Sequence, residues 1–96
     1  MKVNLEEIGV IVSFLLSKLK ASAGNELEIT ADFYWDISVD EIFDPYNEPK
    51  NFSLGQLTDD LQEVQKIIQV DNAISYDLGR IANIIKAISI ENRTAF

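Results

Sequence analysis

The side chains of this chain that could do chemistry are mainly carboxylates. Asp36, Asp40 and Asp44 lie four residues apart, and Glu41 and Glu48 lie beside them. Carboxylate oxygens bind Ca²⁺ and Mg²⁺, but the glycine and the acid spacing of an EF-hand loop are absent. We interpret these acids as solvated side chains of an extended segment, and we keep a divalent-cation site as an alternative.

A second acidic group, Asp59, Asp60 and Glu63, lies in the first half of a predicted helix. Acids near the start of a helix stabilise the positive end of its dipole. Glycoside hydrolysis would need two carboxyls that flank a cleft, and a chain of this length offers little room for one. A small hydrolase remains an alternative, and the carboxylates it could use are Asp36, Asp40, Asp44, Asp59 and Asp60.

The chain contains no cysteine and no histidine. Their absence excludes disulfides, thiolate metal sites and a Ser-His-Asp triad, and it removes the commonest general base. We therefore predict a protein that is not an enzyme and that has no cofactor.

The acidic residues are concentrated in the middle of the chain. The formal net charge is −8, and residues 26–63 contain eleven acidic residues against Lys50 alone. An acidic surface repels phosphates, so we expect no nucleic-acid binding, and it attracts a basic protein or a cation.

The same part of the chain contains most of the aromatic side chains. Tyrosine and tryptophan are enriched in the hot spots of protein interfaces. The alternation of side chains places Tyr34 on the polar side of its segment, whereas Phe33, Trp35 and Ile37 are predicted to face inward. We predict that the outward residues form a partner-binding surface, which consists of Tyr34, Asp36, Asp40, Glu41, Asp44, Tyr46 and Glu48.

These side chains must be positioned by helices and by one extended segment. Residues 4–21 are predicted to form the first helix, in which Asn4 and Glu7 have capping-box spacing and Gly24 is the stop. Residues 27–38 alternate apolar and polar side chains, which is typical of a strand. No second strand of similar quality is evident. The segment could pair with residues 41–43, pair with its copy in a second chain, or lie on the helices as an extended strap.

Two further helices are predicted at residues 53–69 and 75–89, and they form an αα-hairpin. Ser53 and Gln56 have capping-box spacing at the start of the first of them. The predicted fold is mostly α, with three helices and one β-strand or strap, and an α+β fold with a small intermolecular sheet is the alternative.

The chain has an ordinary length for one domain, so we predict a single domain of residues 1–96. The first helix is apolar on several sides and the strand lacks a partner, so we expect a homodimer. The apolar run at residues 8–16 is much shorter than the ~20 residues that span a bilayer. We therefore expect no membrane association and a cytoplasmic location.

Four sequence blocks, YWDI, DPYNEP, LGQLTDDL and ISYDLGR, together resemble a family of small uncharacterised bacterial proteins. The resemblance covers residues 34–88 and implies no established activity. Some small acidic proteins act as immunity proteins against toxins encoded beside them. The sequence thus predicts a small acidic, non-enzymatic protein-binding module. Its specific role would be that of an immunity or inhibitor protein against a basic partner. A structural subunit of a larger assembly is a further alternative.

Overall fold

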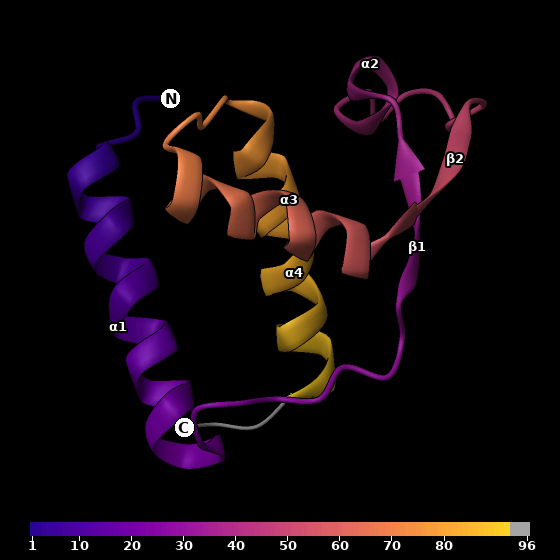
Figure 1. The fold of residues 1–96 in the computed structure, drawn as a ribbon. Coiled ribbons are helices and arrows are strands. Elements are labelled where there is room, and N and C mark those ends of the chain that lie inside the picture. The colour runs from indigo at the N-terminus through magenta and orange to yellow at the C-terminus, as the bar shows by residue number, and fades with distance from the viewer. Residues whose placement is uncertain (93–96) are drawn as a thin grey trace. The chain divides into compact units, whose positions relative to one another are not determined.

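The computed structural model describes residues 1–92, which contain four helices and a two-stranded antiparallel sheet (Figure 1). The fold is mostly helical, which confirms the predicted fold class. The described chain divides into two compact units, residues 1–28 with Asn92 and residues 29–91. In chain order the elements are α1 (Leu5–Ala23), β1 (Phe33–Ile37), α2 (Val39–Ile42), β2 (Phe52–Gln56), α3 (Leu57–Val70) and α4 (Tyr76–Glu91).

Helix α1 begins and ends with the two features that the sequence predicts. Asn4 Oδ1 accepts a hydrogen bond from the backbone N–H of Glu7 at 2.9 Å, which satisfies one of the free donors of the first turn. At the other end, Gly24 has a φ of +91°, which favours glycine, and its N–H donates to the carbonyl of Lys20 at 2.9 Å. The helix runs two residues beyond its predicted end at residue 21.

The predicted strand pairs within the chain. β1 is shorter than the predicted segment, and it lies antiparallel to β2, with Tyr34 opposite Gly55 and Trp35 opposite Leu54. Because β2 supplies the ladder partner, neither residues 41–43 nor a second copy of the chain is needed for it. The prediction of a helix that begins at residue 53 is therefore wrong at its first turn, since residues 52–56 are extended.

The side chain that caps the start of α3 belongs to Asp32, in the segment before β1. Asp32 Oδ1 accepts hydrogen bonds from the backbone N–H of Thr58 at 2.8 Å and from Thr58 Oγ1 at 2.9 Å. Asp32 Oδ2 accepts from Gln56 Nε2 at 2.7 Å, and the Asp32 carbonyl accepts from the N–H of Leu57 at 2.7 Å. The capping box predicted from Ser53 and Gln56 is therefore wrong, because Asp32 caps the helix from another part of the chain.

We expect Asp32→Ala to lower the midpoint of thermal unfolding by several degrees, because three side-chain and backbone donors at the start of α3 lose their acceptor. Asp32→Asn keeps an Oδ1 acceptor and should retain most of the stability. Asp40→Ala is a suitable control, because Asp40 is exposed and its side chain makes no hydrogen bond with the rest of residues 1–92. Melting curves followed by circular dichroism at one protein concentration test the cap, and equal midpoints for Asp32→Ala and Asp40→Ala would contradict it.

Helices α3 and α4 pack against each other as the predicted αα-hairpin. α3 ends at Asp71, which has a left-handed backbone conformation, and its N–H donates to the Ile67 carbonyl at 2.9 Å. Asp77 Oδ2 accepts a hydrogen bond from the backbone N–H of Ile74 at 2.9 Å, which fixes the chain at the entry to α4. The hairpin prediction is confirmed, and its main error is the start of α3.

Few side chains of the described chain are buried. Leu19, with 9% of its surface exposed, is the single buried residue among residues 1–92. Many large apolar side chains are exposed in both units. Burial of apolar surface is the main favourable contribution to folding and association, so this surface favours further contacts.

Candidate functional site

The β1–β2 sheet has one apolar face that is exposed. Because side chains alternate along a strand, Phe33 and Trp35 of β1 share this face with Phe52 and Leu54 of β2. Phe33 is 63% exposed and Trp35 is 66% exposed. The prediction that Phe33 and Trp35 face inward is therefore wrong. We call these four residues the apolar sheet face.

The apolar sheet face continues into a groove. The rings of Trp35 and Phe52 meet edge to face, with centroids 5.4 Å apart. Phe33 and Trp35 also line a groove of about 270 Å³, which Ala87 and Ile90 of α4 line as well. We call it the sheet groove. Its polar lining residues are Tyr34, Asn83, Lys86 and Glu91. Apolar walls with a few polar groups are typical of a recognition site.

A polar cluster joins the sheet to the helical hairpin. The hydroxyl of Tyr34 donates to Asp60 Oδ2 of α3 at 2.6 Å and accepts from Asn83 Nδ2 of α4 at 2.9 Å. Asn83 Nδ2 also donates to Asp60 Oδ2 at 3.3 Å. Burial raises the pKa of Tyr34 above its ordinary value, and the hydrogen bond to Asp60 raises it further. The predicted outward orientation of Tyr34 is wrong, because the half-buried hydroxyl is bonded to both helices.

Gly55 makes room for this cluster. It lies opposite Tyr34 in the ladder, and a Cβ on Gly55 would overlap with atoms of the Tyr34 ring and with its hydroxyl. The tyrosine ring therefore lies across the β2 backbone at the one position of that strand where no side chain is present. This contact positions the hydroxyl against Asp60.

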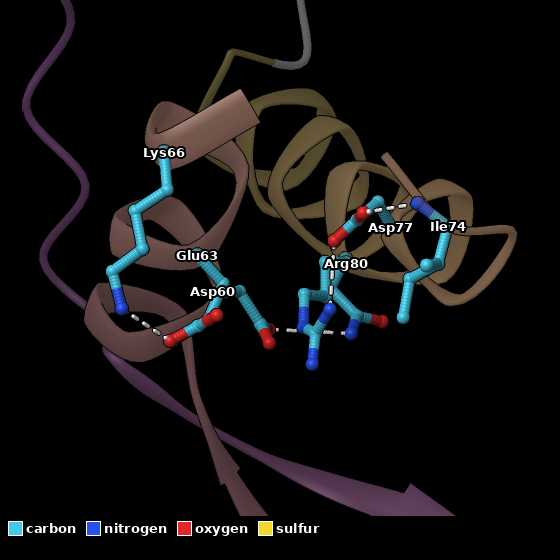
Figure 2. A network of polar contacts seen from close by, with 7 residues as sticks. Asp60, Glu63, Lys66, Ile74, Asp77 and Arg80 are labelled. Atoms are coloured by element: carbon cyan, nitrogen blue, oxygen red, sulfur yellow. Dashed lines mark hydrogen bonds and ion pairs between the residues drawn. The ribbon is translucent and has the colours of Figure 1, made fainter. Parts of the chain in front are cut away.

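Most other charged side chains at the start of α4 and in the middle of α3 are paired within the hairpin (Figure 2). Lys66 Nζ donates to Glu63 Oε1 at 2.9 Å, and Arg80 Nη1 donates to Asp77 Oδ1 at 2.7 Å. The guanidinium of Arg80 also lies 4.5 Å from the ring centroid of Tyr76. Exposed pairs such as that of Glu63 contribute little to stability. These contacts pair the charged side chains of the hairpin with one another.

Two of the predicted partner-binding acids hold the connector that follows α2. Glu41 Oε2 accepts hydrogen bonds from the backbone N–H groups of Lys50 at 2.8 Å and Asn51 at 3.0 Å. Asp44 Oδ2 accepts from Asn47 Nδ2 at 2.9 Å within the next turn. These hydrogen bonds hold the pKa of both carboxyls below the usual value. Glu41 and Asp44 therefore stabilise the local backbone.

The remaining predicted partner-binding residues are exposed. Their side chains make no hydrogen bond or ion pair with other residues in the range 1–92, and they are Asp36, Asp40, Tyr46 and Glu48. Tyr46 is 92% exposed. The structure thus divides the predicted set into residues that are used inside the fold and residues that face solvent.

The sequence analysis missed Phe52 and Leu54 as surface residues. Leu54 belongs to the segment that was predicted as the first turn of a helix, and Phe52 comes two residues before it, just outside that helix. Phe52 and Leu54 alternate with Ser53 and Gly55, and this short period of two is the feature that could have revealed β2.

Within residues 1–92, no group of three or more histidine, cysteine or acidic side chains could hold a metal ion. No helix of the described chain is long and apolar enough to cross a membrane. Comparisons with protein-family models, with curated proteins and with solved structures find no match for this chain. The function of the protein is therefore inferred from the surface chemistry described above.

Proposed function

We propose that the protein is a non-enzymatic protein-binding module, which binds a basic protein through the apolar sheet face and the sheet groove. The observation that carries the proposal is the exposure of Phe33 and Trp35 on one face of the sheet. Contiguous exposed apolar surface marks interaction sites, and tryptophan is enriched among the residues that dominate binding energy. The sheet groove would take an apolar side chain of the partner.

Exposed carboxylates on the sheet and on the segments that follow it favour a basic partner. Asp36 and Phe52 line one open hollow together, and Asp40 and Glu48 are exposed on the segments that follow. The chain as a whole carries a net charge of −8. Complementary charge speeds the encounter with a basic protein and disfavours acidic competitors. An immunity or inhibitor protein that blocks a basic toxin is one specific role for such a surface.

The proposal predicts that Trp35→Ala weakens binding of the partner by about 30-fold or more, which is the effect of truncating a hot-spot residue. The measurement is capture of proteins from a lysate of the source cells on the immobilised protein, followed by titration of the captured basic protein. Binding should also weaken as the salt concentration rises, because salt screens the carboxylates.

Leu5→Ala is the matched control, because Leu5 is a large apolar side chain that is 82% exposed and belongs to α1. Circular dichroism should show the same helix content for both variants. Capture that is equally strong for Trp35→Ala and Leu5→Ala would contradict the proposed surface. Capture of proteins that are not basic would contradict the proposed partner class.

A further inference from the structure

The outer edge of β2 carries backbone donors and acceptors that the ladder with β1 does not use. The N–H of Leu57 donates to the Asp32 carbonyl at 2.7 Å, and these two residues continue the register of the strands. Pairs with and without mutual hydrogen bonds alternate along an antiparallel ladder. Counted from Asp32, the backbone groups of Phe52 and Leu54 therefore point away from β1. Neither residue makes another backbone hydrogen bond within residues 1–92.

Building on the proposed function, on which this inference rests, we propose that the outer edge of β2 binds an extended segment of the basic partner. The segment adds a third, antiparallel strand to the sheet. Its backbone forms hydrogen bonds with Phe52 and Leu54, as in other cases of strand addition at an exposed edge. Every second side chain of the segment then lies beside the side chains of these two residues and extends the apolar sheet face.

The other face of the added strand favours a basic side chain. On that face its nearest neighbour in β2 is Ser53, and Ser53 lies opposite Asp36 in the ladder. Two strand spacings, about 10 Å, separate the added strand from Asp36. Lysine or arginine is long enough to cross this distance over a short serine. Asp36 is exposed and its side chain has no partner within residues 1–92. Lys50 lines the same hollow, but it is the single basic residue among residues 26–63, which contain eleven acids.

An extended basic segment fits this edge better than other parts of the protein do. Helix α1 cannot pair with it, because the backbone groups of a helix are bonded within the helix. Residues 29–32 are held elsewhere, since Glu91 accepts a hydrogen bond from the N–H of Thr30 and Asp32 caps α3. A second copy would bring two strongly acidic segments together, and like charges repel. A basic segment has the opposite charge.

The test uses a short synthetic peptide of alternating valine and arginine, which carries a fluorophore and is titrated with the protein by fluorescence anisotropy. In the proposed pairing the valine amides face β2 and the arginine amides face solvent. Methylation of the valine amide nitrogens should weaken binding by about 10-fold or more, because the hydrogen bonds to β2 are lost. Methylation of the arginine amide nitrogens is the matched control, and it should change binding little.

A charge reversal tests the position of the basic side chain. Asp36→Lys should weaken binding of the unmethylated peptide by about 5-fold or more, because an attraction becomes a repulsion. Glu26→Lys is the control, since it makes the same change in charge at an exposed residue of the other compact unit. Equal effects of the two substitutions would contradict the contact with Asp36.

Amide hydrogen exchange followed by nuclear magnetic resonance locates the added strand. The peptide should slow the exchange of the Phe52 and Leu54 amides. Slower exchange at Phe33 and Trp35 instead would place the peptide on β1 and overturn the proposal. An unmethylated peptide that does not bind overturns it as well, and so do methylations with equal effects or a larger effect at the arginines. If a basic protein is still captured through Trp35 in any of these cases, the proposed function stands and strand addition alone is wrong.

Discussion

Gly55→Ala should lower the free energy of unfolding by about 1–3 kcal/mol, which is the usual effect of forcing an extra methyl group into an occupied space. The added Cβ would overlap with the ring and hydroxyl of Tyr34. The ring must then move, and it carries the hydroxyl away from Asp60 and Asn83. One methyl group therefore disturbs both a cross-strand contact and the hydrogen bonds that join the sheet to the helices.

Gly79→Ala is the matched control for this prediction. Gly79 lies in α4, and a Cβ built on it meets nothing within 4 Å. Because alanine favours a helix over glycine by up to about 1 kcal/mol, Gly79→Ala should raise the stability. The same substitution is thus expected to have opposite signs at two glycines. Urea unfolding at one protein concentration measures both, and a stability gain at Gly55 would show that Tyr34 does not occupy that space.

The parts of the fold that the sequence predicts correctly depend on residues close together in the chain. The N-cap of α1 joins residues three apart, Asn4 and Glu7, and the stop at Gly24 follows from its own backbone conformation. The αα-hairpin likewise follows from the apolar period of each helix and from a short connection. Local interactions of this kind can be recognised in a single sequence.

The start of α3 could not be predicted in the same way. Ser53 and Gln56 have the spacing of a capping box, and this local pattern imitated a helix start. In the structure the cap is Asp32, which lies 26 residues before Thr58 in the chain. Pairing of β2 with β1 also competes with helix formation at residues 52–56. Long-range contacts therefore set the start of α3, although the local sequence favours an earlier start.

The orientation of β1 was predicted wrongly for a related physical reason. Alternation shows that Tyr34 lies on one face and that Phe33 and Trp35 lie on the other, but both faces carry large aromatic rings. The face that turns toward the helices is the one whose hydroxyl finds Asp60 and Asn83. Those partners come from α3 and α4, and the spacing of residues within β1 contains no information about them.

The acidic segment has two roles that its composition does not separate. Glu41 and Asp44 accept hydrogen bonds from the connector, whereas Asp36 and Asp40 have no such partner within residues 1–92. Only carboxylates of the second kind remain fully available to a basic protein. The proposed partner surface therefore has fewer free carboxylates and more apolar residues than the surface that the sequence predicts.

Tyr34→Phe should lower the free energy of unfolding by about 1–3 kcal/mol at neutral pH, because the half-buried Asp60 loses the shorter of its two hydrogen bonds in the cluster. The variant should also change how stability depends on pH. Burial and Asp60 raise the pKa of Tyr34 in the folded chain above the unfolded value of about 10. The folded state therefore holds this proton more tightly than the unfolded state does.

A raised folded-state pKa gives a stability contribution that is complete below about pH 10 and is lost as the pH rises through the folded value. Above about pH 10, the wild-type chain should lose stability more steeply than Tyr34→Phe. The difference between their free energies of unfolding should therefore shrink. Tyr46→Phe is the control, because the Tyr46 hydroxyl makes no hydrogen bond within residues 1–92. Denaturant unfolding from neutral to alkaline pH provides the comparison. Only a difference that is specific to Tyr34→Phe counts as evidence that the hydroxyl joins the sheet to the helices, and parallel curves would exclude that role.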